Sequence, residues 1–382
     1  MSDGLLFLQL HLQWSRTGIR QYRDGGGSTD DRGGLTGRRT RGGLQPAFAV
    51  AVALALTALL AALAGAGAQP VAAQGAAQQW EVQVSAVDPT NGVIMQGFAP
   101  NPLTIRVGDT VTWRWSMNPA PHTVTFNSGK PSPADIVPGP GPGELMLGPG
   151  AFPIGPPGPV IAYDGTQQVS SGIPNDPNGT FSLTFTRTGT FGYVCVLHPG
   201  MRGEVNVREA GAPLTETPAQ ATARGQATAG SLLSRMQAGA AAVSSETMGG
   251  VHTAMAGLGD GFGASALQFL PGDLSVRRGD TVVWVMPDPF EVHTISFPSG
   301  TTPPDFIDPR PPAQPGGPPL LVIPANVAGP VGGSTYAGQG LVSSGIVGNG
   351  GAYFLRFDAP PGSYAYLCLI HPTMRGRVTV TE

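Results

Sequence analysis

Several stretches of the chain alternate apolar and polar residues, which is the pattern of β-strands with one buried face. In LTIRVGDTVTWRW, residues 103–115, Val111 and Trp113 fall on one side of the strand and polar residues on the other. FSLTFTRTGTFGYVCVL and AYFLRFDAPPGSYAYLCLI, residues 181–197 and 352–370, alternate in the same way around a central turn. The pattern predicts short strands and an all-β protein.

The chain carries this pattern twice. LSVRRGDTVVWVM, residues 274–286, matches residues 103–115 at an offset of 171, and the later parts of the two copies match at an offset of 173. A repeat of this length indicates two tandem domains, because solenoid repeats are much shorter. We therefore predict two β-sandwiches of seven or eight short strands each, over residues 80–208 and 251–382.

The segment between the copies, residues 209–250, shifts to Ala, Thr, Gln and Gly, and we predict a partly helical linker there. Thr217 followed by Pro218 is typical of a helix start, because proline suits the first helical position. Two Pro/Gly-rich segments, residues 138–159 and 308–319, occupy matching places inside the copies. We interpret them as ordered surface loops stiffened by proline, with docking of a partner as the alternative.

An apolar Ala/Leu-rich run, residues 47–64, follows an arginine cluster at 38–41 and precedes small residues at 66–68. This order is typical of an export signal. We predict a presequence over residues 1–68, a flexible segment over 69–79, and an exported protein that is periplasmic or on the outer face of the cytoplasmic membrane. The run also comes close to the roughly 20 residues that span a bilayer, so an uncleaved membrane anchor is the alternative.

The composition and charge of the chain limit the classes of partner that it is expected to bind. Charged residues make up only 12% of the chain, and 57 Gly and 39 Pro make up a quarter of its 382 residues, which fits short strands joined by many turns. After residue 68 the chain carries 14 Lys and Arg against 20 Asp and Glu. This acidic balance provides no basic patch for nucleic acid and fits a basic protein partner.

The only two cysteines stand in matching stretches, YVCVLHPGMRGEV at 193–205 and YLCLIHPTMRGRV at 366–378. In both stretches a Cys, a His and a Met follow one another at intervals of three residues. A disulfide between the cysteines is not expected, since it would require two separate cores to meet at the same internal point. Each residue alone would be read as ordinary core packing. The recurrence of Cys, His and Met together at the same intervals instead indicates a functional site.

A thiolate, two imidazoles and a thioether suit copper that cycles between two oxidation states. A loop between two strands can supply Cys, His and Met, and the second His must come from elsewhere in the chain. In each copy, a His lies nine residues after a strand Trp. The pattern predicts two mononuclear copper sites, one from His122, Cys195, His198 and Met201 and the other from His293, Cys368, His371 and Met374.

On these residues both copies resemble cupredoxins, the blue copper proteins, with ligand loops similar to those of the amicyanin and plastocyanin type. The resemblance implies tandem Greek-key β-sandwiches, two type 1 copper ions and the eight residues above as ligands. It also implies that His198 and His371 lie at the solvent edge, where electrons leave. Family members commonly have Asn after the first His, whereas this chain has Thr123 and Thr294, so the reduction potential stays open.

Tandem cupredoxin domains also occur in copper nitrite reductases and two-domain laccases, whose additional copper needs further histidines. Here Val194 and Leu367 precede the cysteines, and His252 is the only histidine outside the copper sites and the presequence. We interpret His252 as an ordinary strand residue. We therefore predict an electron carrier that is not an enzyme.

We predict a redox protein, such as a cytochrome or a respiratory complex, as donor or acceptor, since the acidic balance of the chain fits a basic partner. One alternative is a copper storage, delivery or tolerance protein without a redox partner. A nitrite reductase-like or laccase-like enzyme is the less favoured alternative.

Overall fold

A computed structural model describes residues 76–382, except 116–119, 175, 177 and 199. The predicted presequence, with its apolar run at 47–64, lies outside the described residues. All described residues belong to one unit, Gln69–Glu382. Within this described part, none of the helices combines the length and the apolar character needed to cross a bilayer.

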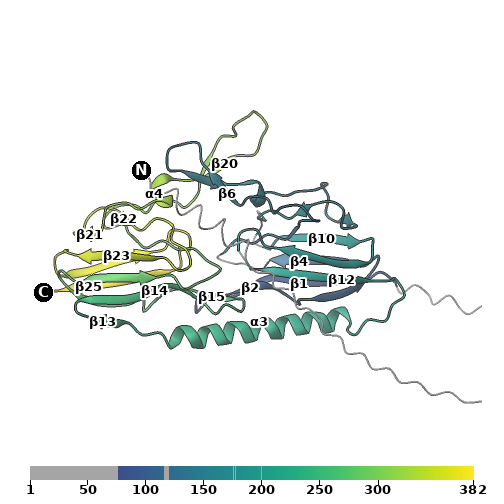
Figure 1. Cartoon of the computed structure of the whole chain (residues 1–382), viewed down its shortest axis with the longest axis horizontal. Coiled ribbons are helices and arrows are strands. Elements are labelled where there is room, and N and C mark those ends of the chain that lie inside the picture. Colours follow the sequence, from purple (N-terminus) through teal and green to yellow (C-terminus); the bar gives the residue numbers. More distant parts are fainter. Residues whose placement is uncertain (1–75, 116–119, 175, 177, 199) are drawn as a thin grey trace, which may run out of the picture. The chain divides into compact units, whose positions relative to one another are not determined.

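The first half (residues 79–208) consists of two packed sheets, as the alternating pattern predicts (Figure 1). In β4 (Thr110–Trp115), Val111 and Trp113 are fully buried while Arg114 between Trp113 and Trp115 is exposed. Beside β4, the first sheet contains β1 (Gln79–Asp88), β2 (Val93–Ala99), β8 (Ile161–Tyr163) and β10 (Thr180–Phe185). The second sheet contains β3 (Leu103–Arg106), β5 (Thr125–Phe126), β9 (Val169–Ser170), β11 (Gly189–Val194) and β12 (Arg202–Arg208).

The second half (residues 251–382) repeats this strand pairing. Strand β14 pairs antiparallel with β15 and parallel with β17, as β1 does with β2 and β4. The sheet contains β14 (Val251–Gly259), β15 (Ala264–Leu270), β17 (Thr281–Val285), β21 (Thr335–Tyr336) and β23 (Ala352–Phe357). The facing sheet contains β16 (Asp273–Arg277), β18 (Ser296–Phe297), β22 (Val342–Ser343), β24 (Gly362–Leu367) and β25 (Arg375–Thr381). The predicted fold class, all-β with tandem sandwiches, is confirmed.

Each half buries its own apolar core between its two sheets. In the first core, Trp113 packs edge-on against Phe126 and Tyr193, and in the second Trp284 packs in the same way against Tyr366. Aromatic side chains bury large areas and hold defined mutual angles, so they fix the distance between the sheets. Both cores also contain the predicted cysteine and methionine ligands.

The sheets of the two halves join through one strand pair. Strands β2 and β15 pair antiparallel, with Met95 opposite Ala264, so that one sheet of 11 strands runs through both halves. Pairing these strands satisfies backbone groups that would otherwise stand at sheet edges. The halves are therefore connected by main-chain hydrogen bonds as well as by the chain between them.

The segment between the halves contains one long helix, α3 (Pro218–Ala241). It begins where the sequence predicts: Thr217 caps the helix, Pro218 takes the first position, and Gln220 completes a capping box. The buried face of α3 consists mostly of small residues, Ala221, Gly225, Ala229, Met236 and Ala240. They let the helix approach β1, β2 and β15 closely, and β13 (Glu246–Met248) then leads into β14. The segment thus packs along the shared sheet.

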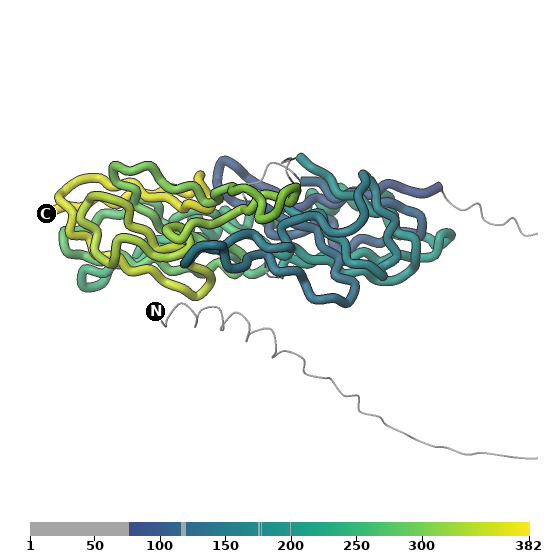
Figure 2. Tube along the Cα trace, turned by 90° about the horizontal axis from the view of Figure 1, so that it is seen from above, coloured from purple at the N-terminus to yellow at the C-terminus, as the bar shows by residue number. Residues whose placement is uncertain are grey.

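The Pro/Gly-rich segments are ordered, as interpreted, but they contain strands as well as loops. They contribute β7 and β19 to a four-stranded sheet from both halves, which the neighbouring β6 and β20 complete and in which β7 pairs with β20 (Figures 1 and 2). Its strands are β6 (Ile136–Pro138), β7 (Leu145–Leu147), β19 (Asp308–Arg310) and β20 (Leu320–Ile323), with short helices η2 (Pro149–Ala151) and α4 (Ala325–Ala328) nearby in the chain. Arg310 binds both carboxylate oxygens of Glu144, at 3.0 and 2.7 Å.

Candidate metal centres

The loop between β11 and β12 carries three of the predicted ligands of the first half. Strand β11 ends at Val194, directly before Cys195, and β12 begins at Arg202, directly after Met201. The Cys195 N–H donates to the Met201 carbonyl at 3.0 Å, and the Met201 N–H donates to the His198 carbonyl at 3.1 Å. These two bonds close the loop between β11 and β12. The pairing of these two core strands therefore fixes the backbone positions of the three predicted ligands in the loop.

The second half closes the corresponding loop in the same way. Strand β24 ends directly before Cys368 and β25 begins directly after Met374. The Cys368 N–H donates to the Met374 carbonyl at 3.0 Å, and the Met374 N–H donates to the His371 carbonyl at 2.8 Å. Both methionine side chains are buried, in the same core clusters as the cysteines.

The remaining histidine of each set comes from the connection between two other strands. In the first half, His122 follows β4, and its Nδ1 lies 3.9 Å from the Sγ of Cys195, while His198 Nδ1 lies 3.4 Å from the same sulfur. All three side chains are buried. The structure therefore brings together residues 73 positions apart in the chain.

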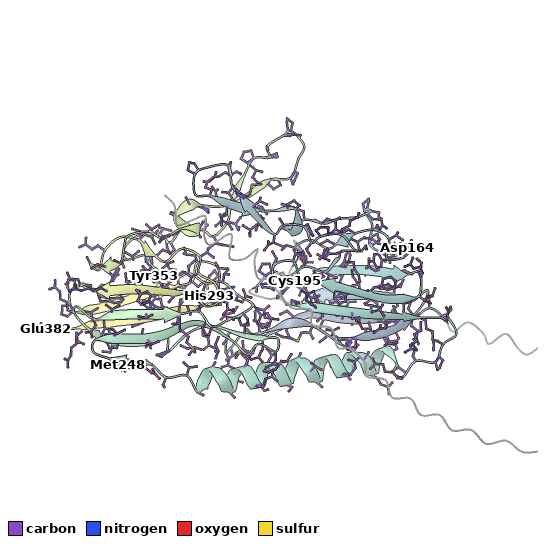
Figure 3. The ribbon with its side chains drawn as sticks, in the orientation of Figure 1. Asp164, Cys195, Met248, His293, Tyr353 and Glu382 are labelled. Carbon is purple, nitrogen blue, oxygen red and sulfur yellow. The ribbon has the colours of Figure 1, made fainter. Side chains whose placement is uncertain are left out.

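The second half places its three atoms similarly. The Sγ of Cys368 lies 4.0 Å from His293 Nδ1 and 3.7 Å from His371 Nδ1, and the two Nδ1 atoms are 3.3 Å apart. Figure 3 labels Cys195 of the first cluster and His293 of the second. Among the described residues, these two triplets are the only groups of three or more His, Cys, Asp or Glu whose ligand atoms converge within 4.8 Å.

These spacings test whether a metal ion fits. With bonds of about 2.0–2.3 Å, as zinc makes with imidazole and thiolate, ligand atoms at trigonal angles lie roughly 3.5–3.8 Å apart. The measured separations of 3.3 to 4.0 Å include that range. Each triplet thus surrounds a space of the right size for one ion held by two imidazoles and a thiolate.

The surroundings of both sulfurs favour the thiolate. Burial alone would raise the pKa of the Cys195 thiol, but the imidazoles of His198 and His122 outweigh it and hold this pKa well below its usual range. The same balance, with His293 and His371, holds the pKa of Cys368 well below its usual range. Thiolate is the form that binds metal.

A threonine after the first histidine stabilises each site. The backbone N–H of Thr123 donates to the Cys195 sulfur at 3.4 Å, and that of Thr294 donates to the Cys368 sulfur at 3.3 Å. The Thr123 hydroxyl accepts from the N–H of Val196 at 3.0 Å, and the Thr294 hydroxyl accepts from that of Leu369 at 2.8 Å. The threonines therefore hold each ligand loop at the residue after the cysteine.

The loop histidines do not lie at the solvent edge, so that expectation was wrong. His198 is 5% exposed and His371 is 1% exposed. The reason is Glu291, a buried carboxylate in the connection between β17 and β18. Its Oε1 lies 3.3 Å from His198 Nε2 and its Oε2 lies 3.4 Å from His371 Nε2.

These contacts shift all three groups of the metal-free protein toward their charged forms. Burial opposes this, but Glu291 and Cys195 outweigh it and raise the pKa of His198 well above its usual range. Contacts with Cys368 and Glu291 likewise outweigh burial and raise the pKa of His371 to about 10. Burial would raise the pKa of Glu291, but the two imidazoles hold it well below its usual range.

Sequence reasoning missed Glu291. The available signal was its position two residues before His293, where the first half has Ala120. A carboxylate in an otherwise apolar stretch beside a predicted ligand needs a partner, because an unpaired buried charge is costly. The sequence could not show that this partner would come from both halves.

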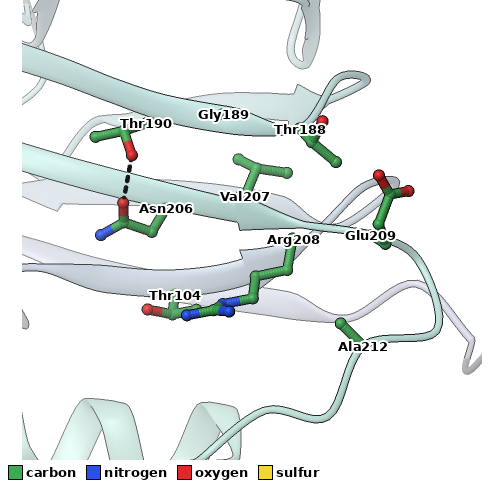
Figure 4. A pocket seen from close by; sticks show the side chains of 9 residues that line it. All are labelled: Thr104, Thr188, Gly189, Thr190, Asn206, Val207, Arg208, Glu209 and Ala212. Atoms are coloured by element: carbon green, nitrogen blue, oxygen red, sulfur yellow. Dashed lines mark hydrogen bonds between the residues drawn. The ribbon is translucent and has the colours of Figure 1, made fainter. Parts of the chain in front are cut away.

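Two other features lie away from the triplets. His252 lies in β14, as interpreted from the sequence, and its Nε2 is 2.9 Å from Asp280 Oδ2. A polar surface pocket lies at the end of β11 opposite to Cys195, where the Thr190 hydroxyl donates to Asn206 Oδ1 at 2.7 Å (Figure 4). The lining residues of this pocket are Thr104, Thr188, Gly189, Thr190, Asn206, Val207, Arg208, Glu209 and Ala212, and they include none of the predicted ligands.

Comparison with known proteins assigns the family. The sequence matches the family described as copper binding proteins, plastocyanin/azurin family, over residues 85–208. A chloroplastic plastocyanin of Oryza sativa subsp. indica is 31% identical over 160 residues, which cover 40% of this chain and 82% of that protein. The chain belongs to the cupredoxins.

Amicyanins are also similar to this chain. Amicyanin-alpha of Methylorubrum extorquens is 28% identical to this cupredoxin over 161 residues, covering 42% of the chain and 98% of the relative. A solved structure of a reduced amicyanin variant matches at 21% identity with a TM-score of 0.21, over 36% of this chain and 87% of that one. The family match falls in the first half, and the second half has the same strand pairing.

Proposed function

We infer that this cupredoxin is an exported blue copper protein that carries single electrons at two mononuclear copper sites, one in each half. The ligands would be His122, Cys195, His198 and Met201 in the first half and His293, Cys368, His371 and Met374 in the second. Copper held there would supply one-electron chemistry, which a thiolate, imidazole and thioether set suits. The protein would have no catalytic site.

One observation carries this proposal: in each half two Nδ1 atoms and one Sγ atom converge in a buried position, with Nδ1–Sγ separations of 3.4 to 4.0 Å. Two imidazoles and a thiolate at trigonal spacing are characteristic of blue copper sites. The family to which the chain belongs is described as copper binding, which supports the choice of metal.

The residues of the chain would keep each site rigid and dry. The ligand loops are closed by backbone hydrogen bonds between loop residues next to the core strands, and the threonine N–H groups donate to the sulfurs. Hydrogen bonds around the sulfur and an apolar shell tune the potential of such sites. Because the ligand positions are fixed by the sheets, they would change little when an electron arrives or leaves.

We also propose the finer organisation of the chain. Residues 80–208 and 251–382 would be the copper domains, 209–250 the connecting segment, and 1–68 an export signal or anchor followed by a flexible segment at 69–79. Export would bring the protein to the periplasm or the outer face of the membrane. A redox protein, such as a cytochrome or a respiratory complex, would exchange electrons with it.

The test is copper loading of the purified chain. We expect two coppers per chain and an intense blue absorption, since a copper–thiolate bond gives the colour of these sites. Cys195→Ser and Cys368→Ser should each remove one copper centre and its share of the absorption, while the double variant removes all of it. A colourless Cu(II) form of the unmodified protein would contradict the proposal.

A chelator distinguishes the alternative of copper storage or delivery. An electron carrier should retain its copper against the chelator and exchange electrons rapidly with a soluble one-electron donor. Ready loss of copper together with slow exchange would favour storage or delivery.

A further inference from the structure

A single carboxylate faces the loop histidines of both halves. Glu291 contributes Oε1 to His198 at 3.3 Å and Oε2 to His371 at 3.4 Å, and all three side chains are nearly inaccessible to solvent. Each carboxylate oxygen of Glu291 thus faces the Nε2 atom of a histidine from a different half. The Nδ1 atoms of the same two rings point to their respective cysteines.

Both halves hold this carboxylate in place. Gln96, from β2 of the first half, donates through its Nε2 to the Oε1 atom of Glu291. The backbone N–H of Glu291 donates to Asp288 Oδ1 at 3.3 Å, and the Phe290 N–H donates to the same oxygen at 2.9 Å. A buried side chain with this many fixed neighbours has little freedom to turn away from either ring.

The chemistry of the rings favours a continuous connection in the loaded protein. When Nδ1 of a histidine binds a metal, its proton resides on Nε2, which then donates to a neighbouring acceptor. Both loop histidines would then carry their proton on the nitrogen that lies 3.3 to 3.4 Å from a carboxylate oxygen of Glu291. A buried carboxylate requires such donors, because burial of an unpaired charge is costly.

The contact between a carboxylate and a loop histidine does not arise separately within each half. The position of Glu291 corresponds to Ala120 in the first half, so the chain provides one carboxylate for two sites. If each site needed its own carboxylate, the first half would lack one. A shared carboxylate instead serves both sites by touching both histidines at once.

We propose that Glu291 connects the two metal sites, so that one electron passes within a single chain between His198 and His371 through its carboxylate. This inference rests on the proposed function. The electron leaves the reduced site and enters the oxidised one, so one site is oxidised as the other is reduced. No covalent bond forms or breaks, and the protons stay on the two Nε2 atoms.

The kinetic test uses the full chain with copper at both sites and Met201→Leu as background. Removing this thioether should separate the first site from the second in absorption and potential. A laser-driven one-electron reductant then delivers less than one electron per chain. We expect a redistribution between the sites whose rate does not depend on protein concentration.

Glu291→Gln and Glu291→Ala in this background should slow the redistribution severalfold while two coppers stay bound. Glu144→Gln is the matched control, because it alters a carboxylate that also contacts a residue of the other half, Arg310, but contacts neither loop histidine, and its rate should equal that of the background. Equal rates in all four proteins, or a rate proportional to protein concentration, would overturn the proposal. So would loss of copper in both Glu291 variants, since Glu291 would then be needed for binding itself.

A second readout needs no copper. In the metal-free protein, Glu291→Gln should shift the imidazole ¹⁵N resonances of His198 and His371 and leave those of His252 unchanged. Unchanged resonances for either loop histidine would show that the carboxylate does not touch both rings. Two coppers and blue absorption in the unmodified chain test the proposed function separately, so failure of one inference is distinguishable from failure of the other.

Discussion

The two candidate sites have the same inner geometry and different surroundings. In both, a Cys directly after one strand meets a His from a distant connection and a His from its own loop. Outside this triplet the halves diverge, because Ala120 in the first half corresponds to Glu291 in the second, and Trp115 corresponds to Met286. The comparison teaches that strand register sets the ligand positions, whereas each half determines separately what supports them.

A β-bulge that occurs in both halves shows this difference. A β-bulge interrupts β1 at Ser85 and β14 at Gly257, and both residues have a left-handed backbone, with φ of 62° and +77°. At Ser85 a side chain is accommodated and its hydroxyl donates to the Met95 carbonyl at 2.6 Å. At Gly257 an added Cβ would lie 2.1 Å from Nε2 of His293. The same bulge therefore tolerates a side chain in one half and excludes it in the other.

The largest effect should come from Gly257→Ala. The new methyl group would displace the His293 ring, with an overpacking cost of about 1–3 kcal/mol and a backbone cost of about 1–2 kcal/mol for a left-handed non-glycine residue. We expect loss of copper from the second site alone, measured as copper per chain, and a lower melting temperature. Gly261→Ala is the control, since φ is +70° and no atom lies within 4 Å of the added group. Two retained coppers in Gly257→Ala would refute this account.

Replacing the threonines by valine should have the next largest effect. Thr123→Val and Thr294→Val each leave the N–H after the cysteine without its acceptor, at a cost of about 1–3 kcal/mol in the free energy of unfolding. The Thr123 hydroxyl also lies 3.9 Å from the Cys195 sulfur, so Thr123→Val should shift the potential of its site more than Thr294→Val does. Denaturant unfolding and potentiometric titration measure these effects. The corresponding serine variants keep the hydroxyl and should behave like the unmodified protein.

Trp115→Phe should affect the first half only. Its indole N–H donates to the His122 carbonyl at 3.1 Å, and Met286 at the corresponding position has no such donor. Loss of this hydrogen bond should cost about 1 kcal/mol and loosen the first site. Hydrogen exchange near His122 should speed up while exchange near His293 does not change. Equal acceleration at both histidines would contradict the assignment.

His252→Gln should have the smallest effect and leave both copper signals unchanged. His252 and the Arg277 N–H lower the pKa of Asp280, so their contribution to stability is present above the ordinary carboxyl pKa and is lost as the pH falls through the lowered value. The side chain of Asp280 is 19% exposed, and such a pair contributes below about 1 kcal/mol. The unfolding curve of His252→Gln should therefore differ from that of the unmodified protein at neutral pH and coincide with it at acidic pH. A changed blue absorption would show that His252 acts at a copper site.

Several features followed from local patterns. The alternation around Val111 and Trp113 predicts the strands, and Thr217 with Pro218 predicts the start of α3, which the structure confirms. The loop ligands are equally local, because Cys, His and Met at three-residue intervals occupy one turn between two strands. The role of these residues as copper ligands stays a proposal, although their Nδ1 and Sγ atoms converge.

Other features could not be read from the sequence. The Pro/Gly-rich segments contribute strands to a sheet shared by both halves, in which Glu144 and Arg310, 166 residues apart, meet. The predicted solvent-edge position of His198 and His371 failed because the halves bury both rings against Glu291. No local spacing predicts which surfaces of two domains will cover one another.

The sequence by itself determined the all-β class and the tandem copies and indicated the candidate ligands, because residue alternation and loop spacing act over a few residues. Only the tertiary structure decided that Gln96 and Glu291, 195 residues apart, would meet, and that one carboxylate would face both sites. The physical reason is that these contacts arise from the packing of one half on the other, which depends on the whole shape of both surfaces.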